Sequence, residues 1–149
     1  MKKILIIFIL FISFKTNAFS QNYKTALGVR LSSAGPVINN SISLKQFINS
    51  TIAVEVLLSI SDPTAIGILI EKHKPLLESS MSWYYGAGAY IGFNTESKFG
   101  AQGVIGLDYT FQKVPLNLSL DWKPEINLIS KILFKATAIG FTARFTFEK

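Results

Sequence analysis

The chain has 149 residues and a mass of 16.5 kDa, which allows one domain and leaves little room for a second. Apolar residues make up 49% of it and charged residues only 16%, so it is too hydrophobic to be intrinsically disordered. It has no cysteine and one histidine, which excludes disulfides and cysteine-ligated metal clusters and leaves little for a histidine metal site. We therefore expect no cofactor and no metal.

The first 20 residues have the pattern of a secretory signal peptide. A basic start is followed by an apolar run from Ile4 to Phe14, and Ala18 and Ser20 are the small residues that a signal peptidase reads. A helix of that length spans about 16 Å, too short for a membrane core of about 30 Å. We expect residues 1–20 to be the signal peptide and residues 21–149 the exported domain.

Signal cleavage changes the charge balance. The whole chain has 15 basic and 9 acidic residues, a formal net charge of +6. Three of the lysines belong to the signal, so the exported domain keeps 12 basic residues against 9 acidic ones, a net charge of +3. This excess is too small to favour nucleic-acid binding, and an exported protein rarely meets nucleic acid. We expect no nucleic-acid partner.

Beyond the signal, bulky apolar residues alternate with small or polar ones. A period of two is typical of β-strands with two different faces, and no window of 18 apolar residues predicts a membrane helix. Turn residues separate the segments, among them Asp62-Pro63 and Lys74-Pro75. The predicted strands are residues 26–31, 41–47, 52–58, 66–71, 83–93, 101–111, 116–123 and 139–147. This pattern favours an all-β fold, an eight-stranded antiparallel up-and-down transmembrane β-barrel.

The two faces of these strands differ in charge. In the seven clearest strands the bulky face has no charged residue, whereas the small face carries glycine, alanine, serine, threonine and a few charges. A water-facing surface would be denser in lysine and glutamate, so the small face fits a narrow lumen and the bulky face fits lipid. The predicted lumen charge network is Arg30, Glu55, Glu71, Asp108, Asp121 and Arg144. With Lys24 and Lys123 included, four bases face four acids.

This network has two possible roles, an ion or proton path and a salt-bridged plug. The interior of an eight-stranded barrel is just wide enough for side chains. An unpaired buried charge costs several kcal/mol, so a filled lumen requires compensated pairs. We therefore expect the plug.

Aromatic residues gather near the strand ends. With both termini in the periplasm, alternate strands run outward and return, which collects the aromatic residues into the two belts that flank a membrane. The predicted periplasmic belt is Tyr23, Trp83, Tyr85, Tyr109, Phe111, Phe145 and Phe147. The predicted outer belt is Phe93, Phe99 and Trp122.

Two sequence blocks, mostly in the second half of the chain, together form a specific sequence pattern. They are residues 71–76 with 83–93 and residues 106–111 with 114–124, and residues 143–147 add to them. The blocks resemble a family of small bacterial outer-membrane β-barrel proteins, eight-stranded and of the OmpX/OmpA type. The resemblance implies a barrel in the cell outer membrane, in contact with its lipid. It also implies insertion by the barrel-assembly machinery, which reads a terminal aromatic residue, here Phe147 followed by two further residues.

The resemblance implies no catalytic residue, because the family has no agreed activity. His73 is the one candidate, since it is close in sequence to Glu71 and to Ser79 and Ser80, the residue types of a serine hydrolase. The predicted topology places His73 in the periplasmic turn after the fourth strand, away from outer-leaflet lipid. We expect a solvated turn histidine.

The connection from Pro124 to Phe134 is the longest and most apolar one. It is expected to fold over the barrel mouth, to form a short amphipathic helix, or to dock a surface partner, because exposed apolar loops often mark interaction sites. Four lysines near the outer end are either contacts for lipid phosphates or surface glycans or simply solvated. They are Lys98, Lys123, Lys131 and Lys135.

The sequence therefore predicts an integral outer-membrane barrel with a side-chain-filled lumen, a structural or adhesive role through its outer loops, and no enzymatic activity. One alternative is an exported soluble barrel that binds a small lipophile in an apolar interior, as lipocalins do. A second alternative is a lipid-modifying outer-membrane enzyme that uses His73.

Overall fold

The computed structural model describes residues 23–33, 37–77, 80–93, 98–129 and 131–147. The predicted signal peptide and residues 148–149 lie outside them. The strands are β1 (Thr25–Ser32), β2 (Ser41–Phe47), β3 (Ile52–Ser59), β4 (Thr64–Leu77), β5 (Met81–Phe93), β6 (Lys98–Thr110), β7 (Leu116–Trp122), β8 (Glu125–Asn127), β9 (Leu133–Lys135) and β10 (Ile139–Phe147). Among the described residues, no helix is long and apolar enough to cross a membrane.

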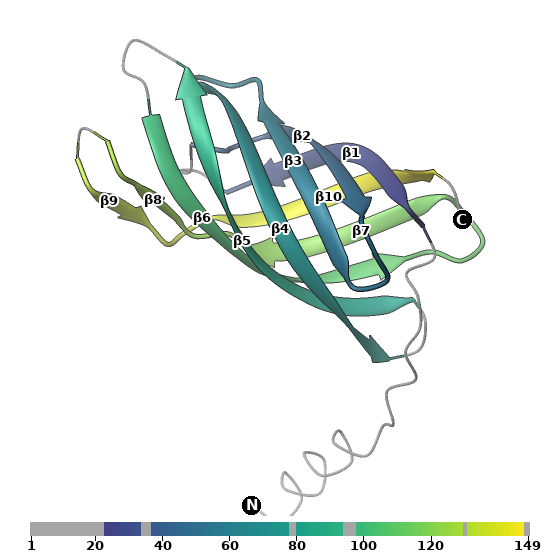
Figure 1. Cartoon of the computed structure of the whole chain (residues 1–149). Coiled ribbons are helices and arrows are strands. Elements are labelled where there is room, and N and C mark those ends of the chain that lie inside the picture. The colour runs from purple at the N-terminus through teal and green to yellow at the C-terminus, as the bar shows by residue number, and fades with distance from the viewer. Residues whose placement is uncertain (1–22, 34–36, 78–79, 94–97, 130, 148–149) are drawn as a thin grey trace, which may run out of the picture.

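Eight of the strands close into a ring, as Figure 1 shows. Antiparallel pairing runs from β5 through β4, β3, β2 and β1 to β10, β7 and β6, and β6 pairs back with β5. The last strand pairs with the first over eight residues, from Thr25 opposite Phe147 to Ser32 opposite Gly140. The predicted fold, an all-β eight-stranded antiparallel barrel, is confirmed. Closure gives every strand of the ring a partner on both sides.

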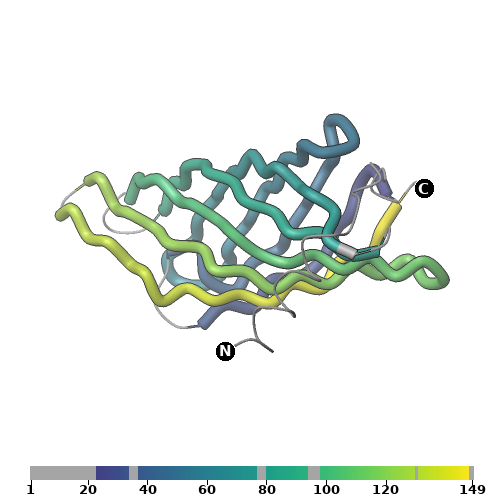
Figure 2. Tube along the Cα trace, turned by 90° about the horizontal axis from the view of Figure 1, so that it is seen from below, coloured from purple at the N-terminus to yellow at the C-terminus, as the bar shows by residue number. Residues whose placement is uncertain are grey.

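The two short strands form a hairpin beyond the ring. Glu125 lies opposite Lys135 and Asn127 opposite Leu133, and β8 also pairs with β6. Figures 1 and 2 show the hairpin at the end of the barrel opposite the C-terminus. We name that end the hairpin end and the other the terminal end. The helix expected as one possibility between Pro124 and Phe134 is wrong, because the described residues pair as strands.

Strand β4 is longer than its alternation predicts. It runs to Leu77, and Pro75 lies opposite Ser82 of β5, so the turn predicted at Lys74-Pro75 is wrong. The amide of His73 donates to the carbonyl of Thr51 on the β3 side. The nitrogen of Pro75, two residues further, faces the same side, and β3, which begins at Ile52, does not extend that far. Proline therefore removes no ladder hydrogen bond there.

Side chains alternate between the outside and the lumen. On β4, Ile66, Ile68 and Ile70 point outward and are 43–62% exposed, while Leu69 and Glu71 between and beside them are fully buried. The buried apolar residues fall into two clusters. One cluster lies toward the hairpin end and consists of Val37, Ile38, Leu57, Ala65, Leu69, Tyr84, Tyr90 and Val104. The other lies at the terminal end and consists of Tyr23, Ala26, Phe47 and Ala53.

Candidate functional site

The six predicted network residues all lie inside the barrel, in two groups. Arg144 on β10 is the centre of the larger group. Its guanidinium donates hydrogen bonds to Glu55, Ser43 (2.7 Å), Ser119 (2.8 Å) and Asn117 (3.0 Å). The carboxylate of Asp108 lies 3.9 Å away. These contacts hold five strands, β10, β2, β3, β6 and β7, together around one fully buried cation.

Lys45 on β2 belongs to the same group, although it is not among the predicted network residues. Its ammonium lies 2.8 Å from the Glu71 carboxylate, 3.9 Å from that of Glu55, and 4.2 Å from the centre of the Tyr84 ring. The alternation of apolar and polar residues is weakest in β2, so the sequence predicts the inner face of this strand least clearly. Its signal was nevertheless present, since Ile42 and Leu44 flank Ser43 and Lys45 in period two.

His73 is a lumen residue, so the prediction of a solvated turn histidine is wrong. It is 1% exposed because β4 and β5 remain paired past it. Its Nε2 lies 2.9 Å from Glu71 and its Nδ1 3.4 Å from the Ser82 hydroxyl, and its ring stacks on Tyr84. The partner serine is therefore Ser82 and not Ser80, and Ser79 lies outside the described residues.

The second group is a bidentate ion pair closer to the hairpin end. Arg30 of β1 donates to both carboxylate oxygens of Asp121 on β7, at 2.5 and 2.7 Å, and the Tyr84 hydroxyl donates to the same carboxylate at 3.0 Å. The Arg30 guanidinium crosses the backbone of Gly140, where a Cβ would come within 2.1 Å of Nη2. A side chain at this position would displace the ion pair.

Lys123 and Glu125 form a third pair, at the mouth. The Lys123 ammonium lies 2.5 Å from Glu125, and the same carboxylate accepts hydrogen bonds from the backbone amides of Val37 (2.7 Å) and Ile38 (3.3 Å). Lys123 is buried and paired, so both predicted alternatives for it, a contact for lipid phosphates or glycans and a solvated lysine, are wrong.

The lumen charges differ from the predicted four bases and four acids. Lys24 is exposed and lies outside the lumen, whereas Lys45 and Glu125 are buried within it. The buried bases are Arg30, Lys45, Lys123 and Arg144, and the buried acids are Glu55, Glu71, Asp108, Asp121 and Glu125. The excess acid lies in the Arg144 group, where His73 bridges Glu71 and Asp108. One additional proton on the His73–Glu71 pair makes the described lumen neutral.

Tyr23 is inside the barrel, so its predicted place in the periplasmic belt is wrong. It is 3% exposed, packs edge-on against Phe47, and donates to Asp108 at 3.4 Å. It precedes β1, so the alternation of that strand does not fix its side. The remaining belt residues lie on the outer face: Trp83, Tyr85, Tyr109, Phe111, Phe145 and Phe147 toward the terminal end, and Phe93, Phe99 and Trp122 toward the hairpin end.

The described residues contain no cluster of three or more histidine, aspartate or glutamate side chains placed to hold a metal ion. A closed ring of eight antiparallel strands, apolar outside and charged within, defines the class of transmembrane-type β-barrels.

Comparison with solved structures identifies the type of barrel. The chain is similar to the N-terminal β-barrel domain of Pseudomonas aeruginosa OprF, with a TM-score of 0.62 and 13% sequence identity over 86% of this chain and 99% of that one. At this identity the likeness establishes the fold alone, that of a closed eight-stranded antiparallel β-barrel. The resemblance to OmpX/OmpA-type barrels is thereby confirmed at the level of fold. No protein-family model and no curated protein matches the sequence.

Proposed function

We propose that the protein is an exported integral outer-membrane barrel that is closed to ions, has no catalytic role, and acts structurally or adhesively through its hairpin end. The observation that carries this proposal is that apolar side chains cover the outer face and charged side chains fill the interior, the reverse of a soluble protein. The outer face of β6 is free of charge from Phe99 to Tyr109, ten residue steps apart. At about 3.4 Å per residue and a tilt of about 40°, that stretch rises about 26 Å, which matches an outer-membrane apolar band of about 25 Å.

The filled lumen supports a closed barrel. Nine charged side chains are buried in it, and the two buried apolar clusters occupy its two ends. A lipocalin-like barrel needs an apolar, open interior, and this interior is charged and packed.

Catalysis through His73 has no support from the geometry. Glu71, His73 and Ser82 form a row that resembles a catalytic triad, but the three side chains are 0–4% exposed and face the packed lumen. A lipid substrate in the outer leaflet has no path to them.

The exposed apolar residues of the hairpin support an interaction role. Ile132 is 79% exposed, Phe134 61% and Leu133 53%, at the end of the barrel that faces outward if both termini are periplasmic. Exposed apolar residues that are grouped in this way mark contact surfaces more often than single ones do.

The test of the membrane assignment is mobility on SDS gels with and without boiling, together with fractionation. We expect the unboiled protein to migrate differently from the boiled protein and to sediment with outer-membrane vesicles. We also expect no stepwise current from the purified protein in a planar bilayer. Release of the protein by osmotic shock, with no gel shift, would contradict the proposal.

A further inference from the structure

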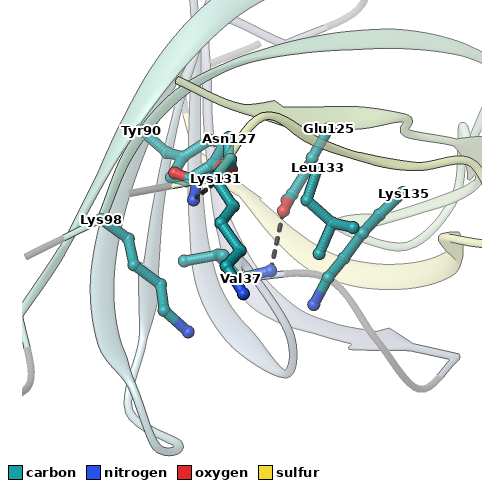
Figure 3. A pocket seen from close by; sticks show the side chains of 8 residues that line it. All are labelled: Val37, Tyr90, Lys98, Glu125, Asn127, Lys131, Leu133 and Lys135. Carbon is teal, nitrogen blue, oxygen red and sulfur yellow. Dashed lines mark hydrogen bonds between the residues drawn. The ribbon is translucent and has the colours of Figure 1, made fainter. Parts of the chain in front are cut away.

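A cavity of about 350 Å³ lies at the hairpin end, between the hairpin, strands β5 and β6, and the segment that precedes β2. Its size is at the lower end of the range of about 300–1,000 Å³ for small-molecule pockets. Figure 3 shows the residues that line it: Val37, Tyr90, Lys98, Glu125, Asn127, Lys131, Leu133 and Lys135.

The cavity is cationic. Lys98 lines it from β6, and Lys131 and Lys135 line it from the hairpin; in Figure 3 their ammonium groups all extend toward the side on which Val37 lies. Glu125 is the one acid among the lining residues, and its carboxylate is already engaged by Lys123 and by two backbone amides. Among the described residues, no ion pair involves Lys98 or Lys131. The site is therefore built for an anion.

Two neutral groups in the cavity have unused hydrogen-bonding capacity. Tyr90 is 2% exposed, and its buried hydroxyl has no hydrogen-bond partner among the described residues. The side-chain oxygen of Asn127 is likewise without a partner, although its NH₂ group donates to the carbonyls of Ile129 and Lys131. A buried hydroxyl that lacks a partner costs free energy, so a ligand that supplies one is favoured.

We propose that this cavity binds a phosphorylated sugar. The phosphate takes the charge-assisted hydrogen bonds of Lys98 and Lys131, with Lys135 beside them. Sugar hydroxyls donate to Asn127 and exchange hydrogen bonds with the Tyr90 hydroxyl. The volume holds a monosaccharide with its phosphate, and inorganic phosphate alone would leave Tyr90 and Asn127 unsatisfied.

The ligand has two possible sources, a glycolipid headgroup of the outer leaflet and a soluble sugar phosphate. The outer face of the hairpin is apolar, with Ile126 opposite both Ala101 of β6 and Phe134 of β9, so it extends the apolar face of β6 past the cavity. This places the cavity beside the lipid surface if the protein spans the outer membrane. The lipid source rests on the proposed function, whereas binding of a soluble sugar phosphate does not.

The experiment uses the full exported chain, folded in detergent micelles and titrated by calorimetry with glucosamine 1-phosphate, glucosamine and inorganic phosphate. We expect glucosamine 1-phosphate to bind most tightly. Binding should weaken about tenfold or more in the double variant Lys98→Gln/Lys131→Gln, because each lost charged hydrogen bond is worth more than a neutral one. The matched control is Lys24→Gln/Lys113→Gln, two exposed lysines at the terminal end, which should bind like the wild type.

A second pair of variants separates sugar recognition from simple charge attraction. Tyr90→Phe should weaken glucosamine 1-phosphate binding several-fold and leave inorganic phosphate unchanged, and Tyr109→Phe on the outer face should change neither. Equal affinity for inorganic phosphate and the sugar phosphate, or equal loss of affinity in the Lys98→Gln/Lys131→Gln variant and in the control lysine variant, would overturn the proposal. So would an absence of binding by all three probes to protein that shows the heat-dependent gel shift.

The source of the ligand is decided in nanodiscs that contain either phosphorylated or dephosphorylated lipid A. If binding of glucosamine 1-phosphate is competed away only by the phosphorylated lipid, the glycolipid is the ligand. If neither lipid competes, the soluble sugar phosphate is the ligand. If both compete equally, phosphate is not recognised and the proposal fails.

Discussion

Replacing Arg144 with methionine removes the cation at the centre of the largest buried group while keeping a side chain of similar length. The change deletes four hydrogen bonds and leaves Glu55 without its closest cation, with Asp108 nearby. Removing one partner of a buried ion pair costs about 3–5 kcal/mol. We expect a loss of that size in the free energy of unfolding.

The assay is urea unfolding of the barrel in lipid vesicles, followed by the fluorescence of Trp83 and Trp122. Lys113→Met, an exposed control, should stay within about 0.5 kcal/mol of the wild type. The double variant Arg144→Met/Glu55→Gln should recover more than about 1 kcal/mol of the loss, because the stranded carboxylate is gone. A loss below about 1 kcal/mol for Arg144→Met would refute the reasoning, since it would mean that water already solvates the lumen charges.

Three further predictions test other parts of the structure. Ile68→Lys, on the outer face of β4, should lower the free energy of unfolding by about 2–4 kcal/mol and impair membrane insertion. Ile60→Lys, in the turn before β4, should be tolerated. Both positions are exposed, so equal tolerance in a fractionation assay would point to a soluble barrel. Gly140→Ala should displace Arg30 and lower the free energy of unfolding by about 1–3 kcal/mol. The control is Gly103→Ala, which should be close to neutral because a Cβ there meets nothing closer than 3.8 Å. Equal effects of the two variants in urea titrations would contradict the role of Gly140. Glu125→Gln should speed amide hydrogen exchange at Val37 and Ile38 about tenfold or more, because the hydrogen bonds it weakens are charge-assisted. Exchange at the amide of Leu57 should be unaffected. Unchanged exchange at Val37 would show that Glu125 does not hold the backbone before β2 in place.

The sequence allowed the strands and their two faces to be predicted because the period of two is local. Ile66, Ile68 and Ile70 alternate with buried neighbours whatever lies across the ring. Strand ends were less predictable, since they depend on partners. Pro75 is typical of a turn, yet it lies in β4. Its nitrogen faces the side of β3, and β3 does not extend as far as Pro75, so no hydrogen bond is lost.

The membership of the lumen network was predictable only where alternation is clean. Arg30 and Arg144 follow it, and the structure places both inside. Lys45 lies in the weakly alternating β2, and Glu125 lies within an apolar connection whose pairing with β6 has no signal in the sequence. The partner of each charge was out of reach altogether, because Arg144 meets Glu55 across 89 residues of chain.

The carboxylate of Glu125 joins the outermost part of the molecule to its interior. It is carried by β8 of the hairpin, yet it holds the backbone at Val37 and Ile38, two residues of the apolar cluster that closes the lumen, and it neutralises the buried Lys123. A displacement of β8 would release both contacts together. The hairpin is therefore tied to the cluster that closes the lumen through one carboxylate, in addition to the pairing of β8 with β6.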